Sequence, residues 1–345
     1  MESRRSLLDL IVVGAGPSGL AVAIAAVRAG LEYEVLEKGM LVEAVFRFPR
    51  GMTFFTTADL LEIGDLPFTT PHPKPTREEA LNYYRRVVDT YDLRIALGEK
   101  VTDVRRETDG CFTVQTLAER PGEPPRPCLR RSRFVAVATG YYDHPNRLGV
   151  PGEDLPHVAH YFDEPHPFHR RRVVVVGGAN SAAEAALVLY RTGAQVTLVH
   201  RRGELSSHIK YWVKPDVENR IKEGTIGARL NSRLLEIRPD HVLVEGPQGR
   251  EEIPADAVFL LTGYRPDTRL LERAGVRIDP DTLAPEHDPR TFETNVPGLY
   301  LAGAVVAGKN TNRIFIENGR FHGAEVVKAI VAREAGGTAR VSGAS

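Results

Sequence analysis

Short aliphatic runs followed by longer helical patterns occur twice along this chain. Residues 10–13 and 172–176 are almost entirely aliphatic, as in strands that are buried on both faces. Each run leads into an alanine-rich stretch with helical spacing, residues 20–29 and 183–191, which stops at or near a glycine. Since another apolar run follows each helix, the pattern predicts two βαβ units with parallel strands.

Further short strands follow each βαβ unit. Alternating or apolar runs predict strands at 94–96, 100–105, 111–116 and 134–138 in the first half, and at 229–238, 242–245 and 257–261 in the second. The last strand of each set ends in Thr-Gly, at Gly140 and at Gly263. The fold class is therefore α/β, with two Rossmann-like nucleotide-binding domains of three-layer ββα type, each carrying a β-meander.

The turn after the first strand has the sequence GAGPSG, with glycines at 14, 16 and 19. Gly14 allows a tight turn, Gly16 lets the backbone approach a pyrophosphate, and Gly19 lets helix and strand pack closely. The free N–H groups at the helix start would bind the phosphates. Glu37 ends the next strand and would accept hydrogen bonds from an adenosine ribose. The motif predicts an adenine dinucleotide without a 2′-phosphate; the alternative is a glycine turn in an ordinary βαβ unit.

The second turn, GGANSA at 177–182, has Ala179 where a second glycine is usual. His200 stands as far from Gly177 as Glu37 stands from Gly14, and Arg201 and Arg202 follow it. A carboxylate would repel a 2′-phosphate, whereas arginines bind one through charge-assisted hydrogen bonds. The second site is therefore interpreted as an NADPH site, the alternative being a solvated charge cluster.

The segment 206–215 follows the arginine pair and contains the only tryptophan. It either extends the NADPH site through Lys210, or covers the nicotinamide entrance, or forms a surface turn. His160, His166 and His169 lie in a proline-rich stretch, where solvated histidines are commoner than metal ligands, so no metal site is predicted.

Composition narrows the function classes. Lysine plus arginine and aspartate plus glutamate both number 45, so no net charge favours nucleic acid or an anionic membrane. Asp9 interrupts the only run that resembles a leader peptide, and no apolar stretch is long enough to span a bilayer. Two cysteines make no disulfide framework. The sequence predicts a cytoplasmic protein that binds neither nucleic acid nor membrane.

Two stretches that contain proline and glycine predict the domain boundaries. Residues 143–156 are rich in proline and glycine, and residues 262–267 provide the return. We expect a discontinuous outer domain, 1–148 and 266–345, which binds FAD, and an inner NADPH-binding domain, 149–265. If the inner domain rotates, the two crossings would act as hinges.

Several motifs occur in an order that resembles one family. They are GAGPSG, FFTTADLLEIGD, ATGYYDHPN, VPGEDLP, HYF, TGYRPD and IFIENGRFHG. Together they resemble the bacillithiol-disulfide reductase family, a branch of the thioredoxin-reductase-like flavoproteins. The resemblance implies FAD and NADPH as cofactors and a homodimer or homotetramer. It also implies an oxidoreductase that passes hydride from NADPH to FAD and on to the disulfide of a low-molecular-weight thiol.

The motifs and the resemblance together give two sets of candidate binding residues. The FAD set is Gly14, Gly16, Pro17, Ser18, Gly19, Glu37, Lys38, Val101, Ala138, Thr139, Gly140, Gly303, Ala304, Arg313 and Ile314. The NADPH set is Gly177, Asn180, Ser181, His200, Arg201, Arg202, Lys210 and Gly263.

Ser18 is where the chain departs from the resembled family, which is proposed to use a cysteine at this place. A hydroxyl forms no mixed disulfide, and the chain has no CxxC motif. Cys111 and Cys128 are interpreted as packing residues. His144 or His322 either donates a proton to a leaving thiolate or is structural.

The sequence does not identify the electron acceptor. The alternatives to a disulfide are a ferredoxin or flavodoxin, as in ferredoxin–NADP reductases, and a redox sensor with little turnover. A flavin monooxygenase would carry an FxGxxxHxxxW-type motif, which is not found at 150–162. Ala304 stands where the wider class has an aspartate, and a helix that starts near Asn312 is expected to direct its N–H groups at the flavin.

Overall fold

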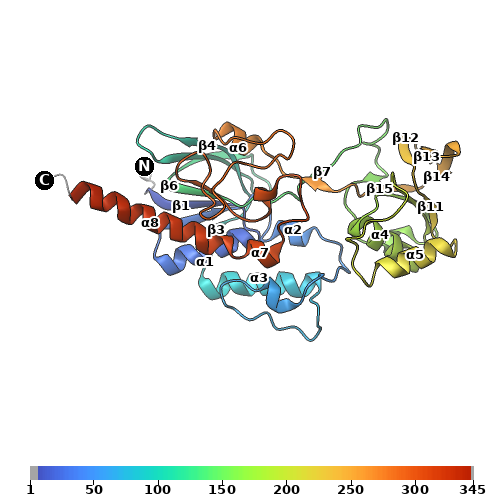
Figure 1. Ribbon diagram of the computed structural model, residues 1–345, viewed down its shortest axis with the longest axis horizontal. Coiled ribbons are helices and arrows are strands. Elements are labelled where there is room, and N and C mark those ends of the chain that lie inside the picture. The colour runs from blue at the N-terminus through green and yellow to red at the C-terminus, as the bar shows by residue number, and fades with distance from the viewer. Residues whose placement is uncertain (1–6, 343–345) are drawn as a thin grey trace. The chain divides into compact units, whose positions relative to one another are not determined.

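The computed structural model describes the backbone of residues 7–342 and the side chains of residues 7–335. The structure divides into two compact units (Figure 1). The first unit comprises Met1–Phe46, Thr56–His144 and Arg265–Ser345, and the second comprises Arg47–Phe55 and Pro145–Tyr264. The chain therefore passes between the units four times. Among residues 7–342, no helix combines the length and apolar character needed to cross a bilayer.

The first unit is built on a seven-stranded sheet in the order β3-β2-β1-β6-β5-β4, with β17 paired to β6. Strands β3, β2, β1, β6 and β17 run parallel, whereas β4, β5 and β6 form an antiparallel meander. The strands are β1 (Leu8–Val13), β2 (Tyr33–Leu36), β3 (Ile95–Ala96), β4 (Glu99–Arg106), β5 (Phe112–Ala118), β6 (Arg126–Val137) and β17 (Leu299–Leu301). The central strand β1 is buried because β2 and β6 flank it on both edges.

Helices surround this sheet, and two of them pack unusually closely. Gly323, near the start of α8, lies against α1: a Cβ there would be 2.5 Å from the backbone of Ala21. Helix α3 begins with a capping box in which Thr76 and Glu79 exchange hydrogen bonds. The helices are α1 (Pro17–Ala29), α2 (Glu43–Phe46), η1 (Ala58–Leu61), α3 (Arg77–Tyr91), α6 (Arg269–Arg273), η3 (Gly303–Ala307), α7 (Ile316–Gly319) and α8 (His322–Ser342).

The second unit repeats the plan on a smaller sheet. Five parallel strands occur in the order β11-β10-β9-β15-β8, and a separate antiparallel meander consists of β12-β13-β14. The strands are β8 (Val158–Ala159), β9 (Arg172–Val176), β10 (Gln195–Val199), β11 (Gly227–Arg229), β12 (Arg233–Ile237), β13 (His241–Gly246), β14 (Gly249–Pro254) and β15 (Ala257–Leu260). The helices are η2 (His166–Phe168), α4 (Asn180–Arg191) and α5 (Lys214–Lys222). At the crossings, β7 (His144–Pro145) pairs with β16 (Tyr264–Arg265).

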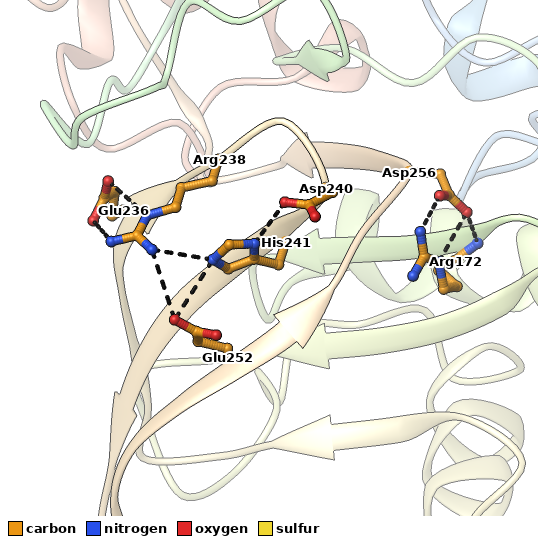
Figure 2. A network of polar contacts seen from close by, with 7 residues as sticks. All are labelled: Arg172, Glu236, Arg238, Asp240, His241, Glu252 and Asp256. Carbon is orange, nitrogen blue, oxygen red and sulfur yellow. Dashed lines mark hydrogen bonds and ion pairs between the residues drawn. The ribbon is translucent and has the colours of Figure 1, made fainter.

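Ion pairs reinforce one face of the second unit. Figure 2 shows Arg172, Glu236, Arg238, Asp240, His241, Glu252 and Asp256. The backbone N–H of Arg172 donates to the Asp256 carboxylate (2.8 Å), and the Asp256 N–H donates to the Arg172 carbonyl (2.8 Å). The start of β9 is thereby tied to the start of β15. The Arg172 guanidinium lowers the pKa of Asp256 to about 2, although exposed pairs of this kind contribute at most about 1 kcal/mol.

The predicted βαβ elements are confirmed, and two other expectations are wrong. Residues 229–238 do not form one strand, because β11 joins the parallel sheet and β12 starts the meander. The helix expected near Asn312 starts at Ile316, lasts one turn, and gives way to α8. Its late start follows from Asn318, whose side chain accepts from the Phe315 N–H (2.8 Å) and donates to the Arg313 carbonyl (2.9 Å).

Candidate functional site

The first glycine turn joins β1 to α1 and has no room for side chains at two of its glycines. Gly14 has a φ of 107°, and a Cβ on it would lie 2.7 Å from the Ala138 carbonyl oxygen. A Cβ on Gly19 would lie 1.9 Å from the Gly14 carbonyl oxygen. Gly16 has nothing within 4 Å of its Cβ position, and no side chain caps α1, which has Pro17 in its first turn. The turn therefore leaves open space and free N–H groups where an anion would bind.

Glu37 follows β2 and faces this turn. Its carboxylate accepts hydrogen bonds from the N–H groups of Ala15 (2.7 Å) and Gly39 (2.9 Å), and the residue is only 6% exposed. Burial raises the pKa of the Glu37 carboxyl, while the two hydrogen bonds act in the opposite direction. The neighbouring Lys38 forms an ion pair with Asp143 (2.6 Å).

The residues after β6 pack against the first glycine turn. The Ala138 N–H donates to the Val13 carbonyl (2.8 Å), which places Ala138, Thr139 and Gly140 directly beside the glycine turn. Gly140 has a φ of 66°. Val101 lies further off in β4, whose first residue, Glu99, donates its N–H to the Glu37 carbonyl (2.8 Å).

Ser18 is enclosed by two glycines from the far end of the chain. A Cβ on Gly303, which has a φ of 76°, would lie 2.5 Å from the Ser18 Oγ, and a Cβ on Gly319 would lie 3.0 Å from it. Ile314 also contacts this point, since its Cγ2 lies 3.4 Å from the Gly319 Cβ position. The structure thus brings the glycine turn, the Gly303–Ala304 turn and the end of α7 together around one hydroxyl.

His322 holds the Gly303–Ala304 turn through a hydrogen bond. Its Nδ1 accepts a hydrogen bond from the Gly303 N–H (3.1 Å), and its ring stacks on Phe292 at 4.1 Å. Burial, with a smaller contribution from His287, lowers the pKa of His322 to about 4. The imidazole is therefore neutral at pH 7, and its proton is on Nε2. His144 is placed differently, with its Nε2 3.4 Å from the Asp267 carboxylate.

Arg313 is exposed, and its guanidinium has no ion pair with any described residue. Because an exposed cation near the Ser18 cluster needs no rearrangement to meet an anion, it is available to a ligand of the first unit.

The second glycine turn has the same construction. Gly177 has a φ of 154°, and a Cβ on it would lie 2.5 Å from the Leu261 carbonyl oxygen. Gly263 follows two residues later and its carbonyl accepts from the Asn146 N–H (2.9 Å). No side chain caps α4, so the N–H groups at Asn180 and Ser181 are free for an anion.

His200 covers the middle of this turn. A Cβ on Gly178 would lie 2.2 Å from the His200 Cε1, so the imidazole fills the place of a side chain there. Burial lowers the pKa of His200, and Arg202 and Arg201 lower it further. Both arginines are exposed, and neither forms an ion pair with a described carboxylate. His200 thus holds the position that Glu37 has in the first unit, and two guanidinium groups without an ion pair to any described residue follow it directly.

Lys210 lies beside the same turn, with its charge already compensated. Its Nζ donates to a Glu184 carboxylate oxygen (2.5 Å) and to the Thr53 carbonyl (2.7 Å). Sequence reasoning missed both partners. Glu184 could have been noticed as the single acid in an alanine-rich helix, whereas nothing local identified Thr53.

Cys111 and Cys128 are both partly buried and unpaired, and both lie in the meander of the first unit, Cys111 directly before β5 and Cys128 in β6. Within the described side chains, no three His, Cys, Asp or Glu residues come together as a metal site would require.

Comparison with known proteins identifies relatives over most of the chain. A family model described as pyridine nucleotide-disulphide oxidoreductase matches residues 11–303. The bacilliredoxin reductase Bdr of Bacillus subtilis is 42% identical over 94% of this chain and 98% of its own length. The solved bacillithiol disulfide reductase Bdr of Bacillus cereus superposes with a TM-score of 0.92 at 40% identity, covering 95% of this chain and all of that one. A ferredoxin–NADP reductase of Ignicoccus hospitalis is 26% identical over 86% of this chain and 90% of its own length.

The family follows from about 40% identity over nearly the full length of the chain. The two dinucleotide turns, which are built alike, agree with it. The chain belongs to the pyridine nucleotide-disulphide oxidoreductases and, within them, to the bacillithiol disulfide reductase branch of the thioredoxin-reductase-like flavoproteins.

Proposed function

We propose that the chain is an FAD-dependent NADPH oxidoreductase that reduces the disulfide of a low-molecular-weight thiol, and that bacillithiol disulfide is the substrate. The observation that carries the proposal is the difference between the two dinucleotide turns. One has the buried Glu37 carboxylate at its sugar position, and the other has His200 there, followed by Arg201 and Arg202, which form no ion pair with a described residue.

In the first unit, the turn at Gly16 and the start of α1 would hold the FAD pyrophosphate, and Glu37 would accept hydrogen bonds from the ribose. Ser18, Gly303 and Ile314 would surround the flavin side of the cofactor, with Arg313 as an adjacent cation. Bound FAD supplies the redox chemistry, accepting hydride from NADPH and passing two electrons on.

In the second unit, the N–H groups at Asn180 and Ser181 would bind the NADPH pyrophosphate. Arg201 and Arg202 would bind the 2′-phosphate, and neutral His200 shapes the turn rather than adding charge. The net reaction consumes NADPH, one proton and one disulfide, and yields NADP⁺ and two thiols.

The cofactor assignment is tested by anaerobic stopped-flow reduction of the flavin. Wild-type protein is expected to prefer NADPH over NADH. Changing Arg201→Gln and Arg202→Gln together should raise the concentration of NADPH at half-maximal rate by about 100-fold or more, since each lost charged hydrogen bond costs about 1.5–3 kcal/mol. NADH kinetics should stay unchanged. Arg250→Gln is the matched control, because Arg250 is an exposed arginine that pairs with Glu245 in the meander.

The acceptor is tested by adding bacillithiol disulfide to the NADPH-reduced protein. Reoxidation of the flavin is expected. A Ser18→Cys variant should reoxidise faster, because a thiolate attacks a disulfide and a hydroxyl does not. Wild-type protein that stays reduced, with a Ser18→Cys variant that behaves identically, would contradict a disulfide substrate.

Ser18 also supports a second candidate, a ferredoxin–NADP reductase, since one-electron transfer requires no thiol. If ferredoxin reoxidises the protein and the disulfide does not, this second function holds. By likeness to its family we further propose a homodimer or homotetramer, which light scattering of the purified protein measures.

A further inference from the structure

A buried lysine in the second unit is held from three directions. Lys210 is 6% exposed. Its Nζ donates to Glu184 on α4 (2.5 Å) and to the Thr53 carbonyl (2.7 Å), and its backbone N–H donates to the Asn180 side chain (2.8 Å). A buried ammonium is costly unless paired and hydrogen-bonded. The two Nζ contacts therefore fix the position of Thr53 relative to α4.

Thr53 belongs to residues 47–55, which we call the strap. The strap comes from the sequence between α2 and η1 of the first unit, yet it packs in the second unit. The Arg47 guanidinium lies 4.1 Å from the centre of the Tyr161 ring, and the Arg50 N–H donates to the Asp163 carbonyl (3.1 Å). At the other end, Phe55 stacks on Trp212 at 5.8 Å.

Lys210 is the link between the strap and the dinucleotide turn. Asn180 is the first residue of α4, where the pyrophosphate would bind, and Glu184 lies one turn further along the same helix. The Asn180 side chain also donates to the His208 carbonyl (3.0 Å). Lys210 therefore connects the start of α4 to the strap.

We propose that Lys210 is a positioning residue, which fixes the strap to the NADPH-binding turn and thereby sets the geometry of hydride transfer. The proposal rests on the proposed function. Hydride transfer requires the reacting atoms to come within about 3.5 Å, so a displacement of about 1 Å can slow it 100-fold. The strap supplies two of the four crossings between the units, so Lys210 holds a segment that is covalently continuous with both.

Direct phosphate binding by Lys210 is the competing role. An ammonium that turned to a phosphate would leave the Glu184 carboxylate and the Thr53 carbonyl without their donor. The two roles differ in what they change: a phosphate ligand controls the affinity for NADP⁺, whereas a positioning residue controls the rate at saturation.

The test uses FAD-loaded protein and the variant Lys210→Met. The rate of flavin reduction at saturating NADPH should fall about tenfold or more, while the dissociation constant of NADP⁺ stays within about threefold. Trp212 is the only tryptophan, so its fluorescence reports the strap. Quenching by acrylamide should increase when Phe55 is released. Lys210→Arg should restore part of the rate. Lys214→Met is the matched control, because Lys214 pairs only weakly with Glu218 on α5 (3.7 Å).

A Lys210→Met variant that binds NADP⁺ tenfold more weakly but is reduced at the normal saturated rate would overturn the proposal. If this variant does not fold, Lys210→Gln replaces it, since a neutral amide keeps the place polar but forms no ion pair with Glu184. An unchanged saturated rate in Lys210→Gln would overturn the proposal as well. Wild-type protein that binds no NADP⁺ at all would instead contradict the proposed function.

Discussion

The glycines of the two dinucleotide turns serve different purposes. Gly14 and Gly177 both have positive φ. Each lies against the carbonyl of the residue that follows a neighbouring strand, Ala138 after β6 and Leu261 after β15. Gly16 has an ordinary φ of −75° and open space around it, so it serves the approach of a ligand. Ala179 has a φ of −118°, which any residue adopts. This is why the second turn tolerates an alanine where the usual motif has a glycine.

Gly303→Ala should disturb the FAD site more than its backbone angle alone predicts. The added methyl group would lie 2.5 Å from the Ser18 Oγ, in addition to the strain of about 1–2 kcal/mol at positive φ. We expect lower flavin content and a lower melting temperature. The control is Gly30→Ala, which has a similar φ of 72° and nothing within 4 Å. Equal effects in both variants, measured by absorbance and thermal melting, would contradict the packing argument.

His322 should make stability depend on pH. Its folded-state pKa of about 4 is below the value of about 6.5 in the unfolded chain, so the unfolded state binds more protons between these values. Stability is full above pH 6.5 and falls by up to about 3 kcal/mol as the pH drops to 4. Urea unfolding midpoints at several pH values measure this. A His322→Gln variant should lose most of this dependence, and an identical profile would mean that other groups cause it.

Sheet strands and the first helix of each unit could be predicted because their signals are local. The run at 172–176 and the alanine-rich stretch after it specify β9 and α4 without reference to the rest of the chain. The late start of α7 could not, because the Asn318 side chain competes for the backbone at Phe315 and Arg313. The division of 229–238 depends on which partner strand each half meets, and a single sequence does not show that.

The buried ion pair of Arg130 stabilises the meander of the first unit, and substitutions of this residue measure by how much. It lies in β6 with a side chain 12% exposed, and its guanidinium binds the buried Glu99 (2.7 Å) and also Glu34. Arg130→Met should cost about 3–5 kcal/mol of unfolding free energy, because Glu99 would be left as an uncompensated buried charge.

Two further variants separate charge from packing at this position. Adding Glu99→Gln to Arg130→Met should recover much of the loss, since no buried charge remains. Arg131→Met changes the next residue, whose pair with Asp109 is exposed, and should cost less than about 1 kcal/mol. Chemical denaturation of the three variants compares them, and a similar cost for Arg130→Met and Arg131→Met would refute the buried-charge argument.

Two nucleotide-binding modules in one chain were predictable from the repeated pattern. The candidate binding residues stay predictions, although the structure brings Gly14, Gly19, Ala138, Ser18 and Gly303 close to one another. The strap was not predictable, because its place in the second unit depends on Lys210 and Tyr161, which are distant in sequence. Val101 stays a prediction, since no contact of its side chain in the structure speaks for a ligand.

Each cofactor is expected to protect its own unit. NADP⁺ at 100 times its dissociation constant stabilises the unit that binds it by about 2.7 kcal/mol. Hydrogen exchange should then slow at 177–182 and 200–202, and also in the strap, while 14–19 and 303–304 respond to FAD instead. Mass spectrometry of peptides with and without NADP⁺ measures this. Protection of 14–19 by NADP⁺ would show that the assignments are exchanged.

The discontinuous make-up of the second unit bears on how this protein can be recombined with its relatives. A chimera that exchanges only Pro145–Tyr264 would leave Arg47–Phe55 behind and pair it with a foreign surface. The residue at position 210 would then come from the relative, while the Thr53 carbonyl that it contacts would not. Hybrids intended to transfer coenzyme preference should therefore carry this nonapeptide along with the larger fragment.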